Sequence, residues 1–167
     1  MRNTIILASL SILLITGCGS KTEEPRAATG RSKAASFVLE DLDGREFSLD
    51  SAAGSVLVLD FWATWCAPCR KAIPELISLY NEYEQEDLLL WGIGIDKPDA
   101  LRSFAESFKI PYPVLVGSRA TQAAYRVTAI PTVFLIDREG RIAGRFQGYR
   151  PGATENLKAE ITKLLKE

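Results

Sequence analysis

The sequence contains no histidine among its 167 residues, and this absence excludes several kinds of active site. Serine–histidine triads, cysteine–histidine hydrolases and histidine-ligated zinc or copper centres all need an imidazole. The formal net charge is only -1, so the chain has no basic excess for nucleic acid or anionic lipid. Acid–base chemistry must come from carboxylates, cysteines, lysines, tyrosines or water, and we expect neither a metal site nor a nucleic-acid partner.

Cysteine is also scarce, with Cys18, Cys66 and Cys69 as the complete set. One lies near the start of the chain and the other two are close together, which predicts two separate roles. The length favours one domain with short appendages, and 47% hydrophobic residues are enough for a buried core.

The first 17 residues have the layout of an export signal. Arg2 is followed by an apolar run over residues 5–15, which is too short to span a bilayer as a helix. The run ends in Ile15-Thr16-Gly17-Cys18, which resembles the lipobox of bacterial lipoproteins. The resemblance implies cleavage before Cys18 and lipid on that cysteine. The alternatives are an ordinary secretory signal or a short anchor, with Cys18 free.

Residues 18–35 are predicted to form a flexible tether, and residues 36–167 a folded domain. The tether is polar, contains Pro25 and Gly30, and has no apolar periodicity. Such a stretch would span roughly 20–25 Å root-mean-square. We therefore expect an extracytoplasmic lipoprotein anchored in a membrane, facing the periplasm or the outer side of the cell membrane.

The predicted domain alternates strand and helix patterns. Asp43-Gly44 between two short strands is typical of a hairpin, and continuous apolar runs indicate buried central strands. The expected strands are residues 37–39, 45–49, 56–62, 88–95, 114–116, 132–136 and 141–146, and the expected helices include residues 67–84, 101–108, 118–125 and 157–165. This order predicts an α/β fold with a mixed sheet and helices on both faces.

The segment Trp65-Cys66-Ala67-Pro68-Cys69 lies between a predicted buried strand and a predicted helix. A helix start offers unpaired N–H groups and the positive end of the helix dipole, and both stabilise a thiolate. We therefore expect Cys66 to have a lowered pKa and to attack, and Cys69, one turn later, to resolve the mixed disulfide. Pro68 suits the first helical turn. The alternatives are a structural disulfide, two metal ligands or inert thiols.

Four further residues are candidates for the same site. Asp60 interrupts the apolar strand, and burial should raise its pKa so that it exchanges protons with Cys69, directly or through water. The alternative is an aspartate that only hydrogen-bonds to nearby backbone. A cis bond at Pro131 would hold the backbone of Ile130 open beside Cys66 for an extended substrate, whereas a trans proline would simply start a strand. Trp65 is expected to cover the site and contact partners.

The segment from Val58 to Cys69 resembles the active-site segment of thioredoxins. Other stretches are similar to the TlpA/ResA branch of membrane-tethered bacterial thiol–disulfide proteins, namely Tyr112-Pro113-Val114-Leu115, Ile130-Pro131-Thr132 and Ile136-Asp137-Arg138-Glu139-Gly140. The resemblance implies a thioredoxin fold with an N-terminal hairpin and a helix-containing insertion. It also implies that Cys66 attacks, Cys69 resolves, Pro131 is cis and Gly148 lines the substrate groove.

Two positions depart from that family pattern. ResA-like members often carry a glutamate three residues after the second cysteine, and this chain has Ala72 there. Thioredoxins place a lysine on the strand beside their buried aspartate, and this chain has Gly92 at the matching position. The proton-handling site is thus expected to contain one carboxylate and no cationic partner.

These features predict a monomeric thiol–disulfide oxidoreductase that reduces exported proteins, with apocytochrome c among its candidate clients. The Cys66–Cys69 disulfide would be its redox group, with no other cofactor and with a membrane thiol donor to re-reduce it. The expected client-binding residues are Trp65, Ala67, Pro68, Ile130, Pro131 and Gly148. The alternatives are a peroxiredoxin-like thiol peroxidase, suggested by Thr64, a copper metallochaperone and a pure binding module.

Overall fold

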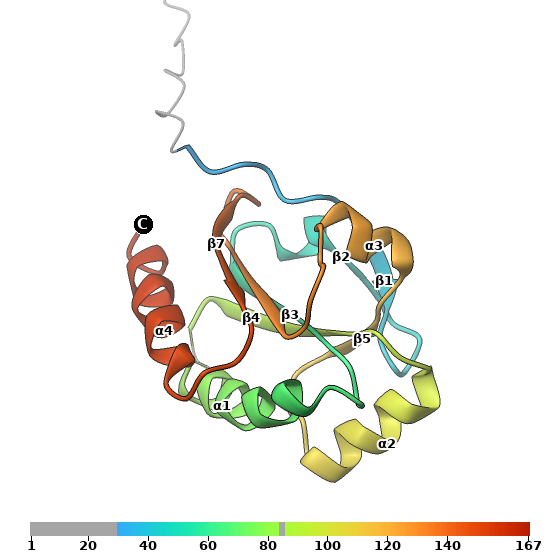
Figure 1. The fold of residues 1–167 in the computed structure, drawn as a ribbon. Helices are drawn as coiled ribbons and strands as arrows, with labels where there is room; N and C mark the ends of the chain where they lie inside the picture. Colours follow the sequence, from blue (N-terminus) through green and yellow to red (C-terminus); the bar gives the residue numbers. More distant parts are fainter. Residues whose placement is uncertain (1–29, 84–85) are drawn as a thin grey trace, which may run out of the picture.

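A five-stranded sheet lies at the centre of the computed structural model, which describes residues 30–83 and 86–167 (Figure 1). The strand order is β5-β4-β3-β6-β7. β3 pairs in parallel with β4 and antiparallel with β6, so the predicted mixed sheet is confirmed. The strands are β3 (Val56–Trp62), β4 (Leu88–Gly94), β5 (Val114–Val116), β6 (Thr132–Ile136) and β7 (Ile142–Gln147).

Helices cover both faces of this sheet, as the sequence predicts. They are α1 (Ala67–Tyr83), α2 (Pro98–Phe108), α3 (Arg119–Ala124) and α4 (Ala153–Leu164). α1 and α4 pack on one face through buried side chains such as Leu76 and Ile161. α2 joins the same face through Leu101 and Phe104, which pack with Trp62 at the end of β3. α3 lies on the other face, near the hairpin (Figure 1).

The predicted N-terminal hairpin is present as β1 (Val38–Glu40) and β2 (Glu46–Ser48), which pair antiparallel. The Asp41 side chain closes its turn, because Oδ1 accepts hydrogen bonds from the N–H groups of Asp43 at 2.8 Å and Arg45 at 2.9 Å. Gly44 has φ +80°, a left-handed conformation that glycine adopts without strain. A 3-10 helix, η1 (Leu49–Ala52), follows the hairpin, and apolar periodicity did not predict it.

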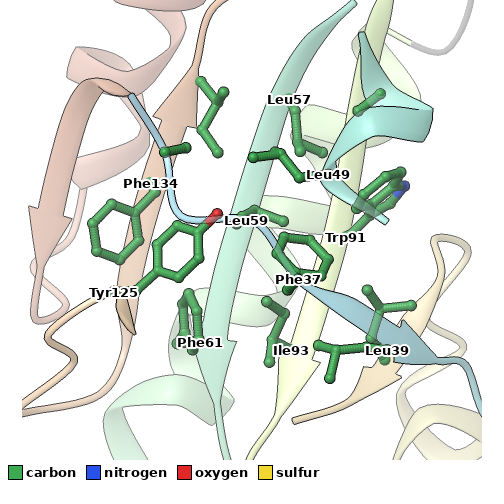
Figure 2. Close-up of a cluster of buried hydrophobic side chains, with 14 residues drawn as sticks. Phe37, Leu39, Leu49, Leu57, Leu59, Phe61, Trp91, Ile93, Tyr125 and Phe134 are labelled. Carbon is green, nitrogen blue, oxygen red and sulfur yellow. The ribbon is translucent and has the colours of Figure 1, made fainter. Parts of the chain in front are cut away.

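Alternate residues of β3 enter two different cores. Leu57, Leu59 and Phe61 face an aromatic cluster formed with the hairpin and the residue after α3, as Figure 2 shows. The ring of Phe61 meets that of Phe134 edge-on, with centroids 5.8 Å apart. Because strand side chains alternate between faces, Asp60 points the other way, toward the side that carries α1.

The end of the predicted tether already contacts the domain. The Ser32 carbonyl accepts from the N–H of Ile142 at 2.8 Å, and the Ala34 N–H donates to the Gly140 carbonyl at 2.9 Å. Ala34 is buried in the aromatic cluster. The predicted signal, Cys18 and the rest of the tether lie outside the described residues. Over residues 30–83 and 86–167, no helix is both long and apolar enough to cross a membrane.

Candidate active site

Cys66 and Cys69 form a disulfide at the N-terminal end of α1. Cys66 directly precedes the first helical residue, and its carbonyl accepts the N–H of Arg70 at 3.1 Å. The Cys69 N–H points at Cys66 Sγ over 3.2 Å, so this sulfur occupies the place of a helix-capping side-chain acceptor. The helix start therefore directs an N–H group and its dipole at Cys66, which favours the thiolate once the bond is reduced.

The two sulfurs differ in access. Cys69 is fully buried, at 0% exposure, whereas Cys66 is 5% exposed. Trp65, beside it, is 69% exposed, and Ala67 and Pro68 are also exposed. An incoming disulfide therefore meets Cys66 first, within a rim formed by the predicted client-binding residues.

A second segment, far along the chain, completes this rim. The Ile130–Pro131 peptide bond is cis, as the family resemblance implies, and the Ile130 carbonyl oxygen lies 3.7 Å from Cys66 Sγ. Gly148, with φ +79°, donates its N–H to the Pro131 carbonyl at 2.8 Å. The structure thus brings Ile130, Pro131 and Gly148 together next to the exposed edge of the disulfide.

An apolar cavity of about 40 Å³ adjoins Pro131 and Gly148. Ala72 and Glu75 of α1 also line it. The Glu75 carboxylate accepts hydrogen bonds from Tyr149 Oη at 2.8 Å and Thr154 Oγ1 at 2.7 Å, so it ties α1 to the start of α4. Glu75 could not be identified from the sequence, because its partners are 74 and 79 residues away.

Asp60 lies on the helix-covered side of β3, 1% exposed, in register with Gly92 of β4. Neither carboxylate oxygen has a hydrogen-bond partner among the described residues, so the alternative of a backbone-bonded aspartate finds no support. Burial raises the pKa of Asp60 to about 7. A carboxyl group that titrates near neutral pH can both accept and return a proton under physiological conditions.

Two buried polar groups near Asp60 were not recognised from the sequence. Trp62 Nε1 and the Tyr112 hydroxyl also lack a hydrogen-bond partner in the part of the chain that the structure describes. Burial, followed by the charge of Asp60, raises the pKa of Tyr112 well above its ordinary value, so this phenol keeps its proton. The only signal in the sequence is Gly92, which leaves room beside Asp60.

Thr64 was the residue that suggested a thiol peroxidase. Its hydroxyl donates a hydrogen bond to Oδ2 of Asp96, a residue that follows β4. The hydroxyl is thus occupied by a carboxylate, which weakens the peroxidase hypothesis. Within residues 30–83 and 86–167, no three histidine, cysteine, aspartate or glutamate side chains gather where they could hold a metal ion.

A helix that starts on a cysteine pair, follows the central strand of a mixed sheet and faces a cis-proline defines a thioredoxin-fold thiol–disulfide oxidoreductase. The sequence profile of the AhpC/TSA family matches residues 31–145, and the chain belongs to that family, on its ResA-like side. The predicted family resemblance, thioredoxin fold and enzyme class are therefore confirmed.

Two curated relatives are described as thiol-disulfide oxidoreductase ResA. The one from Geobacillus thermodenitrificans is 35% identical over 145 residues, which cover 85% of this chain and 83% of the relative. The one from Bacillus thuringiensis subsp. konkukian is 28% identical over 176 residues, covering 99% and 97%. The crystal structure of a putative thiol:disulfide interchange protein DsbE from Chlorobium tepidum is similar with a TM-score of 0.76 and 31% identity, covering 81% of this chain and 96% of the other.

Proposed function

We propose that this protein reduces disulfide bonds of exported proteins outside the cytoplasm, while a lipid on Cys18 holds it at a membrane. The observation that carries the proposal is the position of Cys66 Sγ. This sulfur lies 3.2 Å from the Cys69 N–H at the start of α1, and Cys66 is the more exposed member of the pair. That combination suits a sulfur that attacks a client disulfide and is then released by its neighbour.

The reduced protein begins the reaction with the Cys66 thiolate. Attack on one client sulfur forms a mixed disulfide and expels the other client sulfur as a thiolate. Cys69 then loses its proton to Asp60, and its thiolate attacks Cys66 Sγ. The Cys66–Cys69 bond forms and the second client thiol leaves, so the client gains two electrons and the protein becomes oxidised. A thiol donor in the membrane must then return the electrons.

Client binding uses the rim around Cys66. An extended client segment would lie along the backbone at Ile130 and Pro131, in the manner of an added strand. Trp65 and Pro68 would contact it from the other side, and the apolar cavity beside Gly148 would accept a neighbouring side chain. Exported proteins with disulfides are the proposed clients, and apocytochrome c is the specific client that the family resemblance suggests.

A trapping experiment tests the client class. In Cys69→Ala the mixed disulfide cannot be resolved, so clients should remain covalently attached to Cys66 in the host cell. The double variant Cys66→Ala/Cys69→Ala is the matched control and should trap nothing. A trapped c-type cytochrome precursor supports a role in its maturation, whereas assorted exported proteins support general reduction. Absence of any reducible adduct would contradict the proposal.

Direction and anchoring need their own measurements. Equilibration with thiol buffers measures the reduction potential of the pair. It should lie nearer to about -270 mV, the value for thioredoxin, than to about -120 mV, the value for the strongest oxidants of this fold. A value at the oxidising end would contradict reduction. Replacement of Cys18 by alanine should release the protein from the membrane fraction, and a protein that stays bound would contradict lipid anchoring.

A further inference from the structure

Three buried polar groups gather around one glycine on the helix-covered side of the sheet. The carboxylate of Asp60, Nε1 of Trp62 and the hydroxyl of Tyr112 are all buried and lack partners among the described residues. Asp60 and Trp62 are two residues apart on β3, so they point to the same side. Trp62 also packs with Cys66 and Cys69, which places the group next to the redox pair.

Gly92 opens the space between them. It lies in register with Asp60 on the adjacent strand, and such strands are about 4.8 Å apart. A methyl group built on Gly92 would lie 2.9 Å from Trp62 Nε1 and 3.4 Å from Tyr112 Cε2, the ring carbon beside the one that carries the hydroxyl. Trp62 and Tyr112 therefore border the volume that any other residue at position 92 would fill, and Asp60 lies beside it on the adjacent strand.

The three groups are complementary in hydrogen bonding. An indole N–H can only donate, a phenol can donate, and an ionised carboxylate can only accept. We propose that Tyr112 and Trp62 are positioning residues that donate hydrogen bonds to Asp60 through a bridging water in the space at Gly92, and so set the pH at which Asp60 ionises. This inference deepens the proposed function, since it rests on Asp60 as the group that exchanges protons with Cys69.

No charged partner competes for this role. No lysine or arginine is buried among residues 30–83 and 86–167. Tyr112, before β5, is the titratable side chain whose pKa is raised by burial and by the charge of Asp60. Cys69 and Tyr80 belong to α1, which packs on the same side of the sheet, and the register neighbours of Asp60 are Gly92 on β4 and Val133 on β6, which do not titrate. With no buried cation among these residues, the neutral donors Trp62 and Tyr112 are the groups that can stabilise the Asp60 carboxylate.

The hydrogen bonds act against burial. Burial favours the protonated carboxyl, whereas donors favour the carboxylate. A hydrogen bond to a charged group is worth enough to move a pKa by about 1–2 units. Removal of the Tyr112 hydroxyl in Tyr112→Phe should therefore raise the pKa of Asp60 by about that amount while the ring and its packing are kept.

The titration of Asp60 itself is the decisive measurement. In the oxidised protein, carboxyl-carbon NMR follows Asp60, and the indole N–H resonance of Trp62 should titrate with the same midpoint. Tyr80→Phe is the matched control, because its ring contacts that of Tyr112 with centroids 5.7 Å apart and its hydroxyl is not one of the buried unpartnered groups. Gly92→Ala, which forces the indole nitrogen aside, should raise the midpoint as Tyr112→Phe does.

The outcomes separate this inference from the proposed function. A higher Asp60 midpoint in Tyr112→Phe, with no change in Tyr80→Phe, supports it, and an unchanged midpoint in Tyr112→Phe overturns it. The pH profile of mixed-disulfide resolution should shift together with the midpoint. If Asp60 shifts but that profile does not, the hydrogen bonds stand and the proton transfer between Asp60 and Cys69 is refuted.

Discussion

Replacing Asp60 by asparagine should change how the stability of the oxidised protein depends on pH. Burial raises the pKa of Asp60 to about 7 in the folded state, against 3.8 for an exposed aspartate. The folded protein thus retains a proton that the unfolded chain releases. The stability that this proton provides is fully present below pH 3.8 and is lost as the pH rises through 7.

The size of the effect follows from the difference between the two pKa values. About three pKa units correspond to about 4 kcal/mol between the extremes of pH, of which roughly 2.5 kcal/mol falls between pH 5 and pH 8. Hydrogen bonds from Tyr112 and Trp62 to the carboxylate would reduce this figure. Asp60→Asn keeps the shape of the side chain and removes its titration, so the variant should gain stability relative to the parent as the pH rises.

Urea unfolding of both proteins at pH 5 and pH 8 measures this difference directly. The slopes against urea should agree, which shows that the variant exposes the same surface on unfolding. Asp50→Asn is the control, since Asp50 is an exposed carboxylate in the η1 turn. If the stability difference between Asp60→Asn and the parent is the same at both pH values, Asp60 does not titrate abnormally and the reasoning about its burial is wrong.

Further predictions concern the cysteine pair and the packing around it. In the reduced protein, the rate of alkylation of Cys66 should rise with pH around a midpoint well below the pKa of about 8.5 for free cysteine, while Cys69 reacts slowly because it is buried. A midpoint near about 8.5 would remove the basis for attack by Cys66. Asp137→Asn should lower stability near pH 7 by roughly 1–3 kcal/mol, because Asp137 Oδ1 accepts from the Arg141 N–H at 2.8 Å and Oδ2 from Arg141 Nε at 3.0 Å. Burial raises the pKa of Asp137, but these hydrogen bonds outweigh burial and lower the pKa overall. The stability difference between Asp137→Asn and the parent should therefore shrink as the pH falls below 3.8. Asp87→Asn, at an exposed carboxylate, is the control and should show no such effect. Gly94→Ala should cost about 1–3 kcal/mol, since its new methyl group would overlap Leu101, whereas Gly30→Ala, which has open space around it, should be neutral; equal thermal stability of the two variants would contradict the packing.

Local patterns in the sequence were sufficient for most of the secondary structure. The strands at Val114–Val116 and Thr132–Ile136 have the predicted bounds, because proline and apolar residues define them within a few positions. The last helix buries Leu157, Ile161 and Leu164, as their spacing predicts. In contrast, η1 depends on a capping exchange between Ser48 and Ser51 rather than on periodicity, so a hydrophobic pattern could not predict it.

The residues of the candidate site also fall into those that local sequence predicts and those that only the tertiary structure brings together. The cysteine pair, its helix start and the unusual Asp60 could be recognised from adjacent residues, since the chemistry of a helix N-terminus is local. The groups that meet Asp60 could not be, because Gly92 and Tyr112 reach it only through the register of β4 on β3 and the chain that follows. Glu75 likewise gains its role from Tyr149, which precedes α4, and from Thr154 in the first turn of α4.

The reactive pair, the alternation of strands and helices, and the family resemblance could all be predicted from the sequence alone, because each is encoded in neighbouring residues. The tertiary structure alone decided that the Ile130 carbonyl lies 3.7 Å from Cys66 Sγ, although 64 positions separate these residues. It also decided that a tyrosine and a tryptophan, rather than a cation, border the buried carboxylate. Strand pairing and core packing join distant segments, and no short-range pattern specifies which side chains will then meet.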